Sequence, residues 1–196
     1  MIDYIKGELV EITPTSATIE CYNIGYQLNI SLNTYGAISN EKNIKLYVYE
    51  SIRDDAHILY GFKDKHEREL FMLLISVSGV GPSTARVILS SLSTTELEEA
   101  IASENIAIFK TVKGVGPKTA QRIIIDLRDK IKLASTSDVT IKAEKNELSE
   151  TGHSAVSALV MLGFTQQASQ KVVSKILKEE SGLSIEKVIK EALKRL

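Results

Sequence analysis

The sequence predicts an α+β protein built from several small domains, and three observations lead to this prediction. Apolar residues alternate with polar ones over about the first 60 residues, which is typical of strands. Helical spacing follows, and within it one glycine-rich turn occurs twice, as "SVSGVGPSTA" at 76–85 and "TVKGVGPKTA" at 111–120. A polar stretch precedes a last helical segment. We therefore expect four parts, which are 1–64, 65–133, a flexible linker at 134–148, and 149–196.

The first part is predicted to be a small β-barrel. In "GYQLNIS" the apolar residues Tyr26, Leu28 and Ile30 alternate with polar ones, and "NIKLYVY" repeats this period of two. Several short strands in so few residues favour closure into a barrel, because closure removes unpaired strand edges. Cys21 falls in the same alternating pattern, so we expect it in the barrel core.

The second part is predicted to be helical. In "ERELFMLLISV" the residues Leu70, Leu74 and Val77 lie at i, i+4 and i+7, and Ser93 with Glu96 forms a capping box. An apolar stripe follows the second turn, made of Ala120, Ile123, Ile124, Leu127 and Ile131. Such a stripe indicates a face that packs into a core rather than a cofactor site.

The last two parts differ in composition. The stretch "ASTSDVTIKAEKNELSE" at 134–150 has no aromatic residue, glycine or proline, and we interpret it as a flexible linker. The final segment ends in an amphipathic helix over 185–196 with Ser184 as its expected N-cap. Fewer than about 50 residues make a marginal core, so we expect a three-helix module whose task is docking.

Composition excludes several classes of protein. The chain has 196 residues, of which 43 % are hydrophobic and 25 % charged, as in ordinary soluble proteins. No run approaches the ~18 apolar residues of a membrane span, and the first residues do not resemble a signal peptide. Cys21 is the single cysteine, so we expect no internal disulfide and a reducing, cytoplasmic location. The three histidines have no metal-ligand spacing, and we expect neither a metal nor a cofactor.

The net charge of −1 is unevenly distributed along the chain. The balance is −4 over residues 1–64, +2 over 65–134, −2 over 135–150 and +3 over 151–196. Such blocks suggest modules with different partners, although imbalances of this size also arise by chance.

The repeated turn has a chemistry of its own. Each copy lies between two helical patterns, with Gly-Val-Gly followed by Pro82 or Pro117, a residue suited to the first position of a helix. Glycine permits positive φ and a close approach to the main chain, and the N–H groups at a helix start attract phosphate. Two copies are stronger evidence than one, since a duplex has two backbones that a pair of turns can hold.

The second copy adds positive charge where the first has serine. Lys113 and Lys118 occupy the positions of Ser78 and Ser83, and Arg122 follows. Contacts of this type bind phosphate without reading bases, so we expect salt-sensitive binding directed by DNA shape. The expected DNA-binding residues are Gly79, Val80, Gly81, Ser83, Thr84, Arg86, Lys113, Gly114, Val115, Gly116, Lys118, Thr119 and Arg122.

Two other glycine-rich motifs do not fit the turn. A nucleotide-binding P-loop needs glycine directly before its lysine, and here Pro117 precedes Lys118. The dinucleotide fingerprint needs a preceding strand, whereas a helix precedes each copy. A helix-turn-helix motif with a purely structural packing role remains an open alternative.

Taken together, these residues resemble the RuvA family of Holliday junction branch-migration proteins. The two turns look like its tandem helix-hairpin-helix motifs, and "MIDYIKGELVEI" with "RDDAHILYGF" looks like its N-terminal OB-fold barrel. "AVSALVMLGF" and "SIEKVIKEALKRL" look like its small C-terminal three-helix domain, which is similar to ubiquitin-associated (UBA) folds. The resemblance covers nearly the whole chain.

The resemblance implies a non-catalytic subunit that binds four-way junctions, holds them open and planar, and acts in recombination and DNA repair. It implies a homotetramer, with one or two tetramers per junction left open. It also implies a RuvB-type hexameric ATPase as the motor and a RuvC-type resolvase as a further member of the complex. The C-terminal domain would dock the motor, and Leu162, Gly163 and Phe164 are the candidate docking residues, although Phe164 also fits a core position.

The resemblance further implies an acidic pin at the centre of the junction, carried here by Asp54 and Asp55. The two residues lie in a predicted turn between strands. Aspartate is also a common turn residue, so from the residues alone the pair needs no function. One departure from the family pattern is Ser83, where family members often have a basic residue.

Two other functions are compatible with parts of the sequence. Helix-hairpin-helix repeats occur in nucleases, but adjacent carboxylates on a strand point to opposite faces and chelate a metal poorly. A general DNA-binding protein without preference for junctions is the second alternative, and a comparison of junction with linear duplex distinguishes it.

Overall fold

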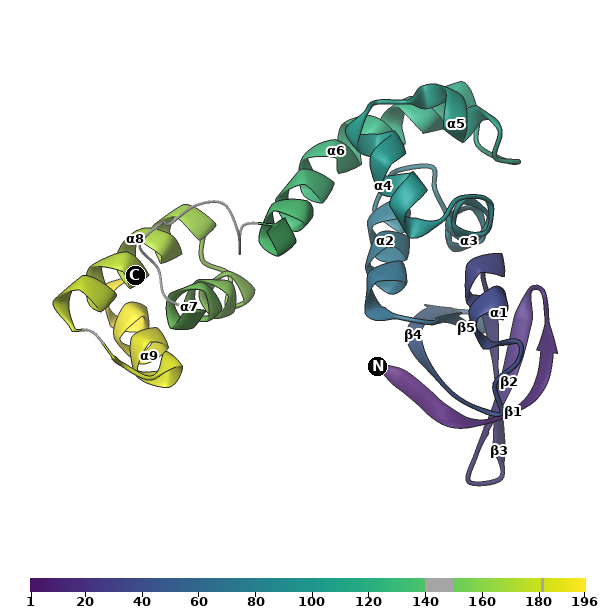
Figure 1. Ribbon diagram of the computed structural model, residues 1–196, viewed down its shortest axis with the longest axis horizontal. Helices are drawn as coiled ribbons and strands as arrows, with labels where there is room; N and C mark the ends of the chain where they lie inside the picture. Colours follow the sequence, from purple (N-terminus) through teal and green to yellow (C-terminus); the bar gives the residue numbers. More distant parts are fainter. Residues whose placement is uncertain (140–149, 181) are drawn as a thin grey trace. The chain divides into compact units, whose positions relative to one another are not determined.

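The computed structural model describes residues 1–139, 150–180 and 182–196 (Figure 1). It divides into two compact units, Met1–Asp138 (unit 1) and Val139–Leu196 (unit 2). The predicted fold class is confirmed, because unit 1 holds a five-stranded barrel followed by helices and the described part of unit 2 is helical. Among the described helices, none is both long enough and apolar enough to cross a membrane.

The barrel closes in the strand order β1-β2-β3-β5-β4. Neighbouring strands are antiparallel except for β3 and β5, which run parallel. The strands are β1 (Tyr4–Thr13), β2 (Ser16–Cys21), β3 (Ile24–Ile30), β4 (Asn43–Arg53) and β5 (Ala56–Phe62). The predicted alternation is confirmed, since Leu28 and Ile30 on β3 and Leu46 and Val48 on β4 point into the barrel core.

Helix α1 (Leu32–Ile38) connects β3 to β4 and is an element that the sequence did not predict. Ser31 caps its first turn by accepting a hydrogen bond from the Thr34 N–H at 3.0 Å. The helix has only seven residues and includes Gly36, so its apolar periodicity is too short to stand out.

Five helices follow the barrel, and they pack around one core. They are α2 (Lys65–Ile75), α3 (Pro82–Ser91), α4 (Thr94–Ala102), α5 (Ile106–Lys110) and α6 (Pro117–Val139). The predicted stripes are confirmed, because Leu70, Leu74 and Val77 are at most 3 % exposed and the α6 stripe is buried. The capping box of Ser93 and Glu96 opens α4, as predicted.

The barrel and the helices of unit 1 share part of their core. Tyr60 and Phe62 of β5 contact the ring of Phe71 on α2, with centroids 5.2 and 4.9 Å apart. The expected boundary after residue 64 therefore falls between two elements that pack together. In Figure 1 the barrel lies at one end of unit 1 and α5 at the other, with α2 and α3 between them.

The linker differs from its predicted extent. Helix α6 continues to Val139, so residues 134–139 are helical. No glycine or proline interrupts residues 118–150, and nothing in the sequence therefore stops the helix at the expected place. The rest of the predicted linker, residues 140–148, lies outside the described residues.

Unit 2 contains α7 (Glu150–Met161), α8 (Gln166–Glu179) and α9 (Ile185–Arg195), which pack around a small apolar core. That core is made of Ala155, Leu159, Val173, Ile176, Val188 and Ala192. Ser184 is the N-cap of α9, as predicted, although its side chain makes no capping hydrogen bond.

Candidate nucleic-acid interface

The first glycine-rich turn connects α2 to α3. The Val80 N–H donates to the Val77 carbonyl at 3.0 Å, and the Ala85 N–H donates to the Gly81 carbonyl at 2.9 Å. Gly79 has φ 91°, which lies in the left-handed region where a side chain is strained. Gly81 is the N-cap of α3 and Pro82 its first residue, as the sequence predicts.

The second turn, between α5 and α6, repeats this geometry 35 residues later. The Val115 N–H donates to the Val112 carbonyl at 3.1 Å, and the Ala120 N–H donates to the Gly116 carbonyl at 2.9 Å. Gly114 has φ 90°, within one degree of Gly79. The repeated letters therefore encode one repeated backbone conformation.

Each turn presents main-chain donors at the start of a helix. In the described residues the N–H groups of Gly81, Ser83 and Thr84 have no hydrogen-bond acceptor, and Gly81 offers no side chain to cap them. The corresponding groups of Gly116, Lys118 and Thr119 are in the same condition. Open donors at the positive end of a helix form a ready anion site.

The valine in each turn does not share this exposure. Val80 is 5 % exposed and Val115 is 7 % exposed, and both belong to the helical core. Their side chains anchor the turns, so any contact they make with DNA is made through the main chain.

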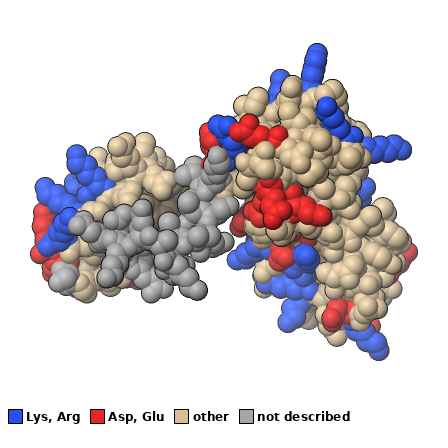
Figure 2. Space-filling view, turned by 45° about the horizontal axis from the view of Figure 1, so that its top comes forward, with Lys and Arg blue, Asp and Glu red and all other residues tan. Residues whose placement is uncertain are grey.

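Positive side chains surround the second turn. Lys113 and Lys118 are exposed, while Ser78 and Ser83 occupy the same positions in the first turn and are exposed as well. Figure 2 shows Lys and Arg side chains projecting from the top of unit 1, where Figure 1 places α5 and the beginning of α6. Turn geometry and cationic side chains therefore coincide at the second copy.

The two arginines of the predicted set contact the protein itself. Arg122 Nη1 donates to the Ser78 carbonyl at 3.1 Å and so joins α6 to the first turn. Arg86 Nη1 donates to the Thr15 carbonyl at 3.0 Å and to Asn29 Oδ1 at 2.9 Å, both in the barrel. Their contact with phosphate stays a prediction, and for Arg86 these two bonds indicate a different task.

Asp54 and Asp55 form the two-residue turn between β4 and β5, in which Arg53 pairs with Ala56. Both aspartates are exposed. Farther along the hairpin, Glu50 pairs with Leu59 and accepts a hydrogen bond from the Ile2 N–H at 2.9 Å. This bond, together with the N-terminus and His57, lowers the pKa of Glu50. Glu50 is paired with the N-terminus, and the exposed Arg53 closes the turn, so the exposed carboxylates at the tip are those of Asp54 and Asp55.

The three histidines lie apart from one another and are exposed. His57 is next to the acidic turn, with Nε2 3.4 Å from Glu50 Oε1, and His66 and His153 are on the surface. In the described ranges, no three His, Cys, Asp or Glu side chains gather as a possible metal site. Cys21 is partly buried at the end of β2, against the barrel core.

In unit 2, Leu162, Gly163 and Phe164 end helix α7. The Phe164 N–H donates to the Leu159 carbonyl at 3.1 Å and the Gly163 N–H donates to the Val160 carbonyl at 3.0 Å, which is a Schellman motif. Gly163 has φ 100°, as this motif requires. Phe164 packs against the core, whereas Leu162 is 59 % exposed, so of the three only Leu162 presents a large apolar side chain to solvent.

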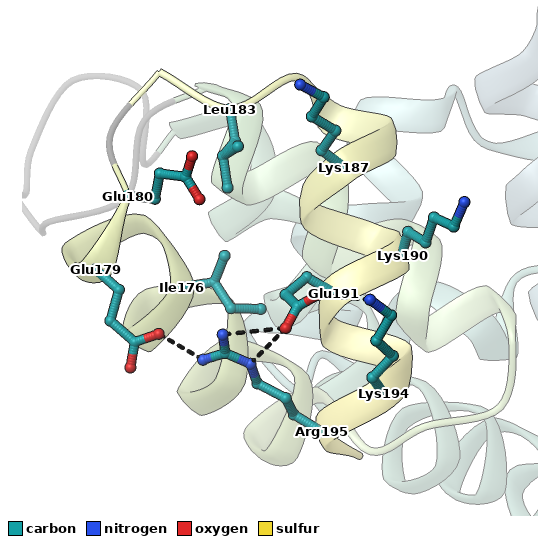
Figure 3. Close-up of a pocket in the computed structure, with 9 residues that line it drawn as sticks. All are labelled: Ile176, Glu179, Glu180, Leu183, Lys187, Lys190, Glu191, Lys194 and Arg195. Atoms are coloured by element: carbon teal, nitrogen blue, oxygen red, sulfur yellow. Dashed lines mark hydrogen bonds and ion pairs between the residues drawn. The ribbon is translucent and has the colours of Figure 1, made fainter.

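A cavity of about 570 Å³ lies between α8 and α9 (Figure 3). Arg195 donates to Glu179 at 2.6 Å and to Glu191 at 3.1 and 3.2 Å, and the figure shows its guanidinium between the two carboxylates. Lys187, Lys190 and Lys194 follow along α9. Arg195 therefore ties α9 to α8, and the neighbouring lysines give α9 a basic edge.

Three family models match successive parts of the chain. The RuvA N terminal domain matches residues 1–61, the SAM-like Helix-hairpin-helix tandem matches residues 71–129, and the RuvA C-terminal domain matches residues 153–196. A protein of Bacteroides thetaiotaomicron named "Holliday junction branch migration complex subunit RuvA" is 55 % identical over 204 residues, which covers all of both chains. This chain belongs to the RuvA family.

Further relatives carry the same name. The protein of Parabacteroides distasonis is 55 % identical over 196 residues and that of Flavobacterium psychrophilum is 44 % identical over 197 residues, again covering all of both chains. The resemblance inferred from the sequence is thus confirmed, together with the succession of RuvA N-terminal, helix-hairpin-helix and RuvA C-terminal domains.

Sequence reasoning missed the polar residues that hold the helices of this RuvA-family chain on its barrel. Glu67 is fully buried and accepts hydrogen bonds from Ser31 Oγ at 2.5 Å and Thr34 Oγ1 at 2.6 Å. Asn33 Nδ2 donates to the carbonyls at the end of α3. Partners 33 to 59 residues apart leave no local pattern, and the one available signal was a glutamate on the apolar side of α2.

Proposed function

We propose that this chain is a non-catalytic DNA-binding subunit that recognises four-way junctions without reading base sequence, holds them open and planar, and recruits a RuvB-type ATPase. The names of its relatives support the branch-migration complex as its setting. The observation that carries the proposal is the pair of matching turns, each with open N–H groups at a helix start.

In this proposal the two turns bind phosphates of the two strands of one DNA arm. Gly81, Ser83 and Thr84 act through main-chain N–H groups in the first turn, while Lys113 and Lys118 add cationic side chains to those of the second. Backbone and lysine contacts position DNA but carry no sequence information. The arrangement favours binding that depends on shape and weakens with salt.

Asp54 and Asp55 act as the pin at the crossover. Two exposed carboxylates on a hairpin tip repel phosphates that approach them. At ~6 Å and an effective dielectric constant of ~40, each charge pair costs on the order of 1.4 kcal/mol. This repulsion separates the strands without trapping them.

Four copies of the chain suit a junction of four arms, because homo-oligomers mostly have closed symmetry and a four-fold arrangement gives each arm an equivalent subunit. We infer a homotetramer, used singly or in pairs, in a cytoplasmic complex with a RuvB-type motor and a RuvC-type resolvase. Unit 2, with its own core, is the motor-docking part in this scheme.

The deciding experiment compares binding of a four-way junction with binding of a linear duplex of equal length, by fluorescence anisotropy with competitor DNA. We expect clear preference for the junction and a mass that corresponds to four or eight chains in the complex. Equal affinity would favour the general DNA-binding alternative, and cut strands in the presence of Mg²⁺ would favour a nuclease.

The pin is tested separately with the double variant Asp54→Asn and Asp55→Asn. Because both side chains are exposed, we expect an unchanged melting temperature and an altered rate of branch migration or altered junction preference. Glu41→Gln, which alters an exposed carboxylate in the connection between α1 and β4, is the matched control. A wild-type rate of branch migration and a wild-type junction preference would mean that Asp54 and Asp55 serve only as turn residues.

Docking of the motor is tested by deleting residues 149–196. Unit 1 keeps its own cores, so we expect junction binding to remain and stimulation of the RuvB-type ATPase to disappear. Loss of junction binding would contradict the modular scheme.

A further inference from the structure

Helix α3, which begins at the first turn, is attached to the barrel by side chains from both. Arg86 lies four residues after Pro82, about 6 Å farther along the helix axis. Its Nη1 atom donates to the Thr15 carbonyl in the β1–β2 connection and to Asn29 Oδ1 on β3, at 3.0 and 2.9 Å. Hydrogen bonds from a charged donor are the stronger kind, so this contact fixes the first half of α3.

The other end of α3 is held by helix α1. Asn33 Nδ2 donates to the carbonyls of Leu89 and Leu92 at 2.7 and 2.9 Å, and these carbonyls lack partners within their own helix. The Leu32 N–H donates to Ser90 Oγ at 3.1 Å. The middle of α3 is therefore fixed on the barrel and its C-terminal end on α1. We call Thr15, Asn29, Asn33 and Arg86 the barrel clamp.

The clamp reaches the strand that carries the acidic turn. Asn29 on β3 pairs with Tyr60 on β5 in the parallel ladder, and β5 begins at Ala56, directly after Asp55. The five residue-to-residue steps from Asp55 to Tyr60 span about 17 Å of strand. A hydrogen-bonded path thus runs from the first phosphate-binding turn through α3, Arg86 and Asn29 to the hairpin of the pin.

The side chain of Arg86 is placed differently from that of a free phosphate ligand. Arg86 is partly buried and has two barrel acceptors, whereas Lys118, the cation beside the second turn, is exposed. A guanidinium already held by two oxygens is fixed in direction. Arg86 can therefore hold α3 in a fixed position on the barrel without contacting DNA.

We propose that Arg86, held by Asn29 and the Thr15 carbonyl, is a positioning residue that sets the distance and angle between the first phosphate-binding turn and the acidic pin, and thereby selects junctions over linear duplexes. The inference rests on the proposed function. In this proposal a linear duplex binds through the turns alone, while a junction binds through the turns and the pin in one fixed arrangement. Loss of the clamp therefore lowers the affinity for junctions and leaves the affinity for duplexes unchanged.

The experiment measures affinity for junction and duplex, and the salt dependence of each, for the full-length variants Arg86→Ala, Asn29→Ala and their combination. We expect each single variant to lower the junction-to-duplex preference by roughly tenfold, the size of a lost hydrogen bond to a charged group. The duplex affinity and its salt slope stay at wild-type values. The double variant loses no more than either single one, because the two residues act through one contact.

Two further variants keep the test decisive. Asn29→Asp retains an acceptor for Arg86 and is expected to keep the preference, which a role of the Asn29 amide as a hydrogen-bond donor does not predict. Lys118→Ala is the comparison for a direct phosphate ligand, and we expect it to flatten the salt slope on both DNAs by about one unit. If Arg86→Ala does not fold, the test is the junction-to-duplex preference of Asn29→Ala compared with that of Asn29→Asp.

The results that overturn the inference are distinct from those that overturn the function. If Arg86→Ala flattens the slope on duplex as Lys118→Ala does while Asn29→Ala is wild-type, Arg86 is a phosphate ligand and the clamp idea fails. If Asn29→Ala keeps the full preference, the clamp does not select junctions. A wild-type chain without preference overturns the proposed function itself, whatever the variants do.

Discussion

The two helix-hairpin-helix copies share a turn but differ in what surrounds it. The first hairpin, α2 to α3, is fixed to the barrel through Glu67, Asn33 and Arg86, and its turn carries serines. The second hairpin, α5 to α6, carries Lys113 and Lys118, and Arg122 on α6 donates to the first hairpin rather than to the barrel. The two copies thus share one main-chain geometry, while contacts to the barrel belong to the first copy and exposed lysines beside the turn to the second.

The largest effect is expected from the anchor of the first hairpin. Glu67→Ala removes the acceptor for Ser31 and Thr34 in a fully buried place, and stranded hydroxyls should lower the free energy of unfolding by about 3 kcal/mol. Urea denaturation measures this loss. Glu69→Ala, exposed on the same helix, is the control and should stay within about 0.5 kcal/mol of wild type. Equal stabilities would mean that the hairpin is held by apolar packing alone.

The next effect concerns the charge of the second hairpin. Lys113→Ala combined with Lys118→Ala should flatten the salt slope of DNA binding by roughly two units, or about a tenfold smaller loss of affinity between about 50 and 200 mM salt. Ser78→Ala with Ser83→Ala alters the matching positions of the first hairpin and leaves the Ser78 carbonyl in place for Arg122. Anisotropy titrations over salt should show no change of slope for this pair. Identical salt slopes for both double variants would mean that the lysines of the second turn contribute no more to phosphate binding than the serines of the first.

A smaller effect tests what the copies share. Gly79→Ala and Gly114→Ala each place a side chain at φ near 90°, and no atom lies within 4 Å of either new Cβ, so strain alone should cost about 1 kcal/mol at both sites. Gly81→Ala, at φ −89° and with equally open space, is the control and should cost less. Thermal unfolding compares the three. Unequal costs at 79 and 114 would show that the surroundings, not the turn, set the strain.

The smallest effect concerns α4, which lies between the hairpins in the sequence. The Ser93 N–H and hydroxyl donate to Glu96 and hold the pKa of this carboxyl below its usual value. The stabilisation is therefore present above the ordinary glutamate pKa and is lost as pH falls through the lowered folded-state pKa. Glu96→Gln should show a weaker fall of stability over this acid range than wild type, measured by melting temperature against pH. Parallel curves of melting temperature against pH would mean that the hydrogen bonds from Ser93 to Glu96 add no net stability.

The sequence by itself determined the repeating elements of this protein. Period-two alternation located β3 and β4, helical stripes located the buried faces of α2 and α6, and the duplicated Gly-Val-Gly-Pro located both turns to the residue. These features follow from local rules, because side-chain period and positive φ depend only on neighbouring residues. Proline at 82 and 117 fixed the helix starts for the same reason.

Only the tertiary structure decided which residues of other elements these helices and turns contact. In the sequence Arg86 is one more cation near a glycine-rich turn, yet it donates to Thr15 and Asn29, and Arg122 contacts the other hairpin. Glu67 lies on the apolar side of α2 in the sequence pattern, but the pattern does not give its partners, which are the hydroxyls of Ser31 and Thr34 at the start of α1. Such contacts join residues tens of positions apart, and their energy depends on distances and burial that no local pattern contains.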